Sequence, residues 1–148
     1  MIGLLQRVSA ASVSVDGGAI GSIGRGILVL VGIERDDGQA QVDRLAQRLL
    51  GYRVFADRDG KMNLSVRDID GGVLLVPQFT LAADTGKGMR ASFTSAAAPA
   101  QGRLLFDCLT ATMRGQHRTV ASGAFGTDMQ VALVNDGPVT FLLRVSAS

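Results

Sequence analysis

Hydrophobic and polar positions alternate in the first part of the chain, a pattern typical of β-strands that bury one face. The alternation begins at Ile2 and returns at Val13 and Val15, and the Asp-Gly-Gly sequence at 16–18 then supplies a tight turn. We therefore expect the chain to open with a β-hairpin. The run 26–33 is apolar without alternation and rich in β-branched residues, which predicts a central strand covered on both faces.

Two later segments have the helical spacing of three and four residues. Val42 and Leu45 belong to an apolar stripe that predicts a helix from about residue 39 to residue 51. A second stripe follows Pro99, a residue suited to the first turn of a helix, and predicts a helix that extends to about Gly115.

The remaining segments predict short strands and a long loop. A short strand is expected at 62–66, and a longer apolar run covers 73–81. Pro77 interrupts that run and cannot donate a ladder hydrogen bond, so we expect it at an edge, at a bulge or in the final part of the strand. Residues 82–97 have no clear period and predict a long loop of the kind that often carries function. Alternating residues on both sides of 135–138 predict a closing hairpin.

These elements predict an α+β domain that spans residues 1–148, with a mostly antiparallel sheet, able to close as a barrel-like sheet, and two external helices. With 47% hydrophobic and 19% charged residues, the chain is too apolar to be disordered as a whole. Its apolar runs are much shorter than the roughly 20 residues that cross a bilayer, so no membrane association is expected. The start of the chain lacks the features of a secretory signal, and a cytoplasmic location is the default expectation.

Composition narrows the chemistry further. A single cysteine, Cys108, and a single histidine, His117, leave too few ligands for a zinc site, so we expect no metal and no other cofactor. No Gly-x-Ser-x-Gly elbow is present, and we expect His117 to be a solvated residue just past a helix end rather than the base of a catalytic triad. The net charge of +2 is compatible with a partner that presents a few phosphates.

Two segments contain more chemistry than local structure requires. Pro77-Gln-Phe-Thr-Leu81 places an amide, an aromatic ring and a hydroxyl at the end of an apolar strand, which is either the mouth of a site or a frayed edge strand in water. Asn135-Asp-Gly-Pro-Val-Thr140 is either a plain hairpin turn or a rigid backbone feature, since a cis bond before proline costs only about 0.5–1 kcal/mol.

Taken together, the motifs of this chain resemble those of the D-aminoacyl-tRNA deacylase family. The matching segments cover nearly the whole chain and lie at residues 1–8, 60–64, 78–84, 88–90 and 128–141. The resemblance implies a homodimer of compact, barrel-like subunits. Such a hydrolase removes D-amino acids, and also glycine, from the 3′ acceptor end of tRNA while it rejects L-aminoacyl-tRNA, which is chiral proofreading in translation.

The resemblance also implies roles for individual residues. Gln78, Phe79 and Thr80 would line the adenosine and ester end of the pocket, with the backbone of Phe79 and Thr80 facing the carbonyl oxygen. Pro77 stands where the family more often has serine, so one hydroxyl and one N–H are missing here, and the stringency of chiral selection is left open.

Chiral selection is implied for a second group of residues. Gly137-Pro138 would be a cis dipeptide that enters the partner subunit's pocket and blocks an L side chain, and Arg7 would hold it in place. Phe125 and Met129 would shape the adenine recess. The presence of Phe79 and Arg7 favours the stricter members of the family.

Two mechanisms and two other functional classes stay open. Thr80 is a covalent nucleophile in one mechanism; in the other, which the resemblance favours, main-chain N–H groups hold the carbonyl and the ribose 2′-hydroxyl helps to activate water. A tRNA-end binding module without turnover and a generic esterase are the rival classes. The basic residues that either contact the acceptor stem or form a solvated face are Lys87, Arg90, Arg103 and Arg114.

Overall fold

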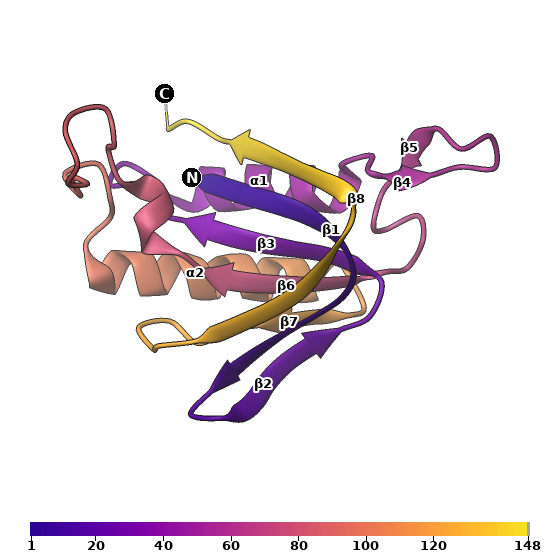
Figure 1. Cartoon of the computed structure of the whole chain (residues 1–148). Coiled ribbons are helices and arrows are strands. Elements are labelled where there is room, and N and C mark those ends of the chain that lie inside the picture. The colour runs from indigo at the N-terminus through magenta and orange to yellow at the C-terminus, as the bar shows by residue number, and fades with distance from the viewer. Residues whose placement is uncertain (148) are drawn as a thin grey trace.

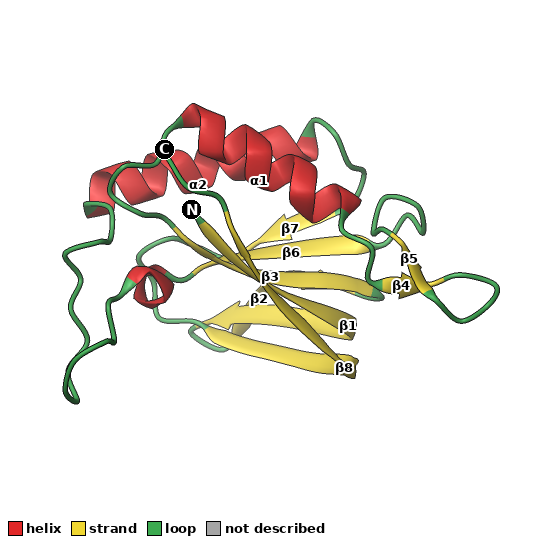
Figure 2. Cartoon of the chain, turned by 90° about the horizontal axis from the view of Figure 1, so that it is seen from above, coloured by secondary structure: helices red, strands yellow, loops and turns green. Residues whose placement is uncertain are grey.

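A six-stranded mixed sheet carries two helices on one face, as the computed structural model of residues 1–147 shows (Figure 1). Its strands are β1 (Ile2–Val15), β2 (Gly18–Ile23), β3 (Gly26–Gly32), β6 (Gly72–Pro77), β7 (Val120–Ser122) and β8 (Gln130–Arg144). The helices are α1 (Gln39–Gly51) and α2 (Pro99–Arg114), and η1 (Phe79–Ala82) is a short 3-10 helix. A separate ribbon of β4 (Phe55–Ala56) and β5 (Met62–Leu64) lies at the margin of the sheet (Figure 2).

The locally encoded elements lie where the sequence predicts them. The opening hairpin is confirmed, and its turn contains Asp16 and Gly17, both with positive φ. Both predicted helices are present, and Val42 and Leu45 of the α1 stripe are fully buried. Pro77 is the last residue of β6, so it lies in the final part of the strand, which was one of the three predicted positions. Its missing N–H does not break the ladder within the strand.

The expectation of a mostly antiparallel sheet needs correction, because the sheet is mixed. Strand β3 runs parallel to β6, and β6 runs parallel to β7. The physical reason is that α1 lies between β3 and β6 in sequence and α2 lies between β6 and β7, and such crossovers return the chain in the same direction. Strand β1 pairs with β2, β3 and β8, which curls the sheet into a nearly closed barrel.

The predicted closing hairpin is wrong. Strand β8 is continuous, and both of its halves pair with β1: Gln130–Asn135 lies along Val8–Ser14, and Thr140–Arg144 lies along Ile2–Gln6. The two halves therefore cannot pair with each other. Residues 136–139 form an irregular, bulge-like insertion in the ladder, and the turn-forming residues Asn-Asp-Gly-Pro serve that insertion instead of a hairpin.

Hydrophobic residues are buried on both faces of the sheet. Val29 of β3 belongs to the core between the sheet and the helices, where it joins Leu45 of α1. The adjacent Leu28 belongs to a second core on the opposite face, inside the curl of the sheet, together with Leu74 of β6. Strand β3 is thus covered on both faces, as its unbroken apolar run predicts.

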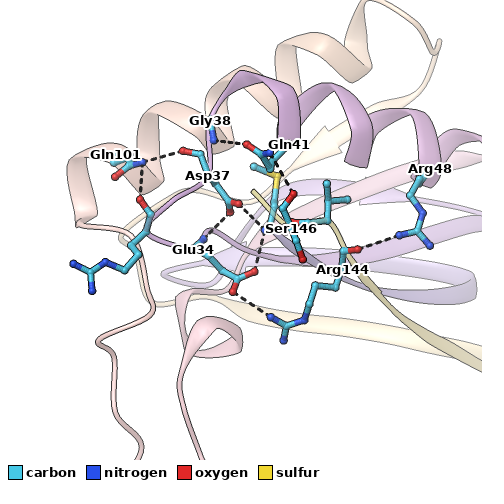
Figure 3. Close-up of polar contacts among 11 residues, drawn as sticks. Glu34, Asp37, Gly38, Gln41, Arg48, Gln101, Arg144 and Ser146 are labelled. Atoms are coloured by element: carbon cyan, nitrogen blue, oxygen red, sulfur yellow. Dashed lines mark hydrogen bonds and ion pairs between the residues drawn. The ribbon is translucent and has the colours of Figure 1, made fainter. Parts of the chain in front are cut away.

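The start of β1 is anchored by a charge network that is partly buried (Figure 3). The Met1 ammonium donates to a carboxylate oxygen of Asp37 at 2.8 Å, to one of Glu34 at 3.0 Å and to the carbonyl of Val145 at 2.8 Å. Arg144, at the end of β8, pairs with the second Glu34 oxygen at 3.1 Å. This network joins β1, β8 and the segment that leads from β3 into α1.

Candidate functional site

A cavity of about 540 Å³ opens at the carboxyl ends of β3 and β6. The two strands end side by side, because Val31 pairs with Pro77 and Gln78 continues the ladder by donating its N–H to the Val31 carbonyl at 2.8 Å. The other walls come from the first turns of α2 and from residues 125–129, which connect β7 to β8. The long loop 83–97 connects η1 to α2 beside this cavity (Figure 2).

Five of the residues singled out in the sequence meet at this cavity. Its lining includes Pro77, Gln78, Phe79, Phe125 and Met129. Phe79 leaves 61% of its surface exposed, so one wall of the cavity is an aromatic ring that solvent can reach. The segment 77–81 is thus the mouth of a cavity, and the reading of a frayed edge strand is not supported.

Thr80 lies next to the cavity, at its Gln78 side. The Gln78 side-chain amide donates a hydrogen bond to the Thr80 hydroxyl, and Thr80 is exposed. The N–H groups of Phe79 and Thr80 are the first donors of η1, and the first donors of a helix have no acceptor within it. Within residues 1–147, neither N–H donates a hydrogen bond to a group outside the helix. Two neighbouring backbone donors are therefore available beside the cavity.

Two further residues shape the Phe125 wall, and the sequence analysis missed this role for both. The Arg103 guanidinium lies 5.3 Å from the centre of the Phe125 ring and donates to the Phe125 carbonyl at 3.3 Å. Gly102 faces the same ring so closely that a Cβ atom there would lie 3.1 Å from it. Gly102 itself could have indicated this contact from the sequence. A glycine inside a helix costs about 1 kcal/mol relative to alanine, and close packing against the helix is a common reason for it.

Arg7 and Gly137-Pro138 form a second group. The Arg7 guanidinium donates to the Asp136 carbonyl at 3.0 Å and to the Val54 carbonyl at 2.7 Å. The expected contact between Arg7 and this segment is therefore present. The Gly137-Pro138 peptide bond is cis.

The two groups lie at opposite ends of the sheet. Val8, next to Arg7, pairs with Gly26, which pairs with Gly72 at the amino end of β6. The cavity begins near Val31, five residues further along β3, which corresponds to about 17 Å of strand. Gly137 and Pro138 consequently do not line the cavity of their own chain.

His117 is not the solvated residue that we expected from the sequence. It is 92% buried, and its Nε2 lies 2.6 Å from the carbonyl oxygen of Gly71, just before β6. The chain turns back after α2 to begin β7, which brings the ring onto the sheet at the end opposite the cavity. His117 therefore has a packing role.

Neither a metal cluster nor a membrane helix is found in the described part of the chain. Across residues 1–147, no three side chains of His, Cys, Asp or Glu gather closely enough to hold a metal ion. Over the same residues, no helix has both the length and the apolar character needed to span a membrane.

Comparisons with known proteins find relatives along almost the whole chain. The model of the family described as D-Tyr-tRNA(Tyr) deacylase matches residues 4–144. A D-aminoacyl-tRNA deacylase of Methylococcus capsulatus is 64% identical over 144 residues, which are 97% of this chain and 94% of that protein. One of Pseudomonas putida is 61% identical over 145 residues, which are 98% of this chain and 100% of that protein.

Two solved structures share the fold. A structure titled c-Myc DNA Unwinding Element Binding Protein superposes with a TM-score of 0.95 at 38% identity and covers 99% of both chains. The structure of a probable eukaryotic D-amino acid tRNA deacylase has a TM-score of 0.83, with coverage of 96% and 97%, and at 18% identity it supports the fold alone. The family match and the relatives extend over almost all of the sequence, including both groups of candidate residues. The chain therefore belongs to the D-Tyr-tRNA(Tyr) deacylase family, whose members are hydrolases that act on ester bonds.

Proposed function

We propose that this protein hydrolyses the ester bond of D-aminoacyl-tRNA and of glycyl-tRNA, and that it rejects L-aminoacyl-tRNA. Family membership supports the reaction class. The observation that carries the proposal is the cavity beside the available N–H groups of Phe79 and Thr80. We infer that the enzyme acts in the cytoplasm, where aminoacyl-tRNA is used.

The size and lining of the cavity suit the terminal aminoacyl-adenosine of tRNA. A volume of about 540 Å³ falls in the usual range for small-molecule sites. In our proposal the adenine ring lies between Phe125 and Met129, and the ester lies over Gln78 and Phe79.

Hydrolysis in this arrangement relies on the backbone. The N–H groups of Phe79 and Thr80 would donate to the ester carbonyl oxygen and stabilise the negative charge that develops when water attacks. The water oxygen forms a bond to the carbonyl carbon of the ester, and the bond between that carbon and the ribose oxygen breaks. A proton of the water passes to the ribose oxygen as it leaves. The 2′-hydroxyl of the same ribose assists the water. No metal or cofactor takes part in this scheme.

Thr80 is a poor candidate for the nucleophile. A hydroxyl attacks efficiently only when a base removes its proton, and the group that contacts the Thr80 hydroxyl is the Gln78 amide, which donates a hydrogen and is not a base. We therefore favour the mechanism in which water is assisted by the substrate's own hydroxyl.

Chiral selection is proposed to come from a second copy of the chain. The Gly137-Pro138 segment lies at the end of the sheet opposite the cavity, so only a partner subunit can bring it to the ester. A backbone carbonyl placed against the α-carbon leaves room for hydrogen or a D side chain and collides with an L side chain. The proposed assembly is a homodimer with two equivalent sites.

The deciding experiment compares the hydrolysis of D-tyrosyl-tRNA, L-tyrosyl-tRNA and glycyl-tRNA at substoichiometric enzyme, with a chelator present. Rapid loss of the D and glycyl esters with the L ester intact supports the proposal. Loss of the L ester as well would mean that the pocket with Pro77 is less selective and accepts both isomers. Binding of tRNA without turnover would indicate a binding module, and cleavage of small activated esters in preference to charged tRNA would indicate a generic esterase.

A further inference from the structure

Residues 83–95 form an exposed arm between η1 and α2 (Figure 2), and both of these helices contribute residues to the cavity lining. Its two sides are joined by an isolated antiparallel bridge, in which the N–H of Asp84 donates to the Ser92 carbonyl at 2.7 Å and the N–H of Ser92 donates to the Asp84 carbonyl at 2.9 Å. Its base is held by the Ser95 hydroxyl, which donates to the Ala82 carbonyl at 2.6 Å, and by the N–H of Arg35, which donates to the Ser95 carbonyl at 3.0 Å. The arm therefore has a defined position beside the cavity.

The tip of the arm is basic and exposed. Lys87 and Arg90 lie on either side of Gly88 and Met89, and all four residues are exposed. The single acidic residue of the arm, Asp84, accepts a hydrogen bond at 2.9 Å from the N–H of Gly86. The tip thus presents two cations and an uncovered apolar side chain to any partner that approaches the cavity.

An aromatic pair connects the arm to the cavity. Phe93 of the arm and Phe79 of the cavity wall have ring centres 5.3 Å apart, with an angle of 39° between their planes. The two side chains are 44% and 61% exposed. Exposed aromatic rings combined with nearby cations are the features by which proteins bind single-stranded nucleic acid, because bases stack on the rings and phosphates contact the cations.

We propose that the arm binds the single-stranded RNA that adjoins the terminal adenosine of the substrate. This inference rests on the proposed function and extends its site beyond the ester. The base next to the terminal adenosine stacks on Phe93, and the phosphates that follow contact Lys87 and Arg90. The order of these groups outward from the cavity matches the order of adenosine, unpaired bases and stem in a charged tRNA.

The test compares two substrates with the same ester. D-tyrosyl-adenosine ends where the cavity ends, whereas D-tyrosyl-tRNA extends over the arm. We expect Phe93→Leu to lower kcat/KM about tenfold for D-tyrosyl-tRNA and to leave D-tyrosyl-adenosine within twofold of the wild type. The double variant Lys87→Gln/Arg90→Gln should reduce the salt dependence of kcat/KM for the tRNA, with a change of about 1.4 in the log–log slope for two lost phosphate contacts.

A matched control is available on α1. Arg44 and Arg48 are cations of this helix, and neither belongs to the arm, to the cavity lining or to the Gly137-Pro138 segment. Arg44→Gln/Arg48→Gln should leave both substrates and the salt slope unchanged. An equal loss in this control would show that only net charge matters and would overturn the proposal.

Other outcomes also decide the question. Equal losses on both substrates, or a changed sedimentation coefficient of the arm variants, would overturn the proposal, because the arm would then act on the cavity or on a second copy. Should the wild type hydrolyse neither ester, the proposed function fails on its own. The arm is then tested by fluorescence anisotropy of uncharged tRNA, where unaltered affinity of the arm variants would overturn it.

Discussion

Pro138 restricts the backbone conformation of the segment to which we assign chiral selection. Its ring fixes φ, and Arg7 donates at 3.0 Å to the carbonyl of Asp136, the residue before Gly137. We expect Pro138→Ala to reduce the preference for D-tyrosyl-tRNA over L-tyrosyl-tRNA at least tenfold, because alanine allows the carbonyl to move away from the α-carbon. The rate with the D ester should change little. Hydrolysis of both esters measured side by side checks this, and an unchanged ratio would remove the dipeptide from chiral selection.

Thr80 tests the mechanism at the scale of one hydroxyl. Valine has nearly the shape of threonine, so Thr80→Val removes the hydroxyl and retains the backbone N–H that we assign to the carbonyl oxygen. We expect single-turnover hydrolysis of D-tyrosyl-tRNA within about threefold of the wild type, since the hydroxyl has no base beside it. A loss of a thousandfold or more would instead identify Thr80 as the nucleophile.

At the scale of the element, α2 forms a wall of the cavity through Gly102. We expect Gly102→Ala to stabilise the helix or leave its stability unchanged, because alanine is the better helix former by about 1 kcal/mol. The new methyl group would press on the Phe125 ring, 3.1 Å away, so KM for D-tyrosyl-adenosine should rise several-fold. Thermal unfolding and steady-state kinetics together distinguish these effects.

The same substitution at Gly51 is the control for α2. Gly51 ends α1, and a Cβ atom there would meet no other atom within 4 Å. Gly51→Ala should therefore leave KM at the wild-type value. A similar rise in KM for both variants would mean that the effect of Gly102→Ala does not pass through Phe125.

The turn between β4 and β5 should respond to acid. Asp57 accepts hydrogen bonds from the Asn63 side chain at 2.9 Å and from the N–H groups of Lys61 and Asp59, and these bonds lower the pKa of the Asp57 carboxyl. Because this pKa is lowered in the fold, the stabilisation of the turn is fully present above the ordinary carboxyl pKa and is lost as the pH falls through the lowered one. We expect Asn63→Ala to raise the pKa of Asp57 toward its ordinary value, as an NMR titration of the carboxyl would show.

An NMR titration also contains its own control for this turn. The pKa of Asp68 is lowered mainly by its hydrogen bonds with Ser65, which do not involve Asn63. It should be the same in Asn63→Ala and in the wild type. A change at Asp68 alone would contradict the assignment.

Elements could be predicted from the sequence where their signals are local. The two helices and the opening hairpin depend on spacing and on a turn that lie within each element, and these predictions hold. The closing hairpin was wrong because Asn135 to Pro138 has the same local signals for a turn and for an insertion, and the choice depends on pairing with β1 more than a hundred residues away. β7 has only three residues, too few to produce a detectable pattern.

At the scale of the whole molecule, the sequence predicted part of the site. Periodicity identified 77–81 as a candidate mouth, and the family resemblance supplied Phe125, Met129 and Arg7. Neither could show that Gly102 faces Phe125, since that contact depends on how α2 packs against the end of the sheet. The division of the residues between two ends of the sheet also follows only from strand register.

Placement of the cavity and Gly137-Pro138 at opposite ends of one sheet has a genetic consequence. If each cavity is completed by the other subunit, defects in the two places complement each other in a mixed dimer. Thr127→Trp would block the cavity mouth, where Thr127 is exposed, and leave the dipeptide intact. In a dimer of this variant with Pro138→Ala, the open cavity belongs to the Pro138→Ala subunit and receives an intact dipeptide.

Mixing the two variants should therefore restore a function that neither has alone. We expect an excess of the inactive Thr127→Trp protein, refolded together with Pro138→Ala, to return the preference for D over L esters toward the wild-type value. A preference that stays at the level of Pro138→Ala would mean that each chain selects with its own dipeptide. Restoration of the preference would instead make chiral discrimination a property of the pair of subunits rather than of either chain.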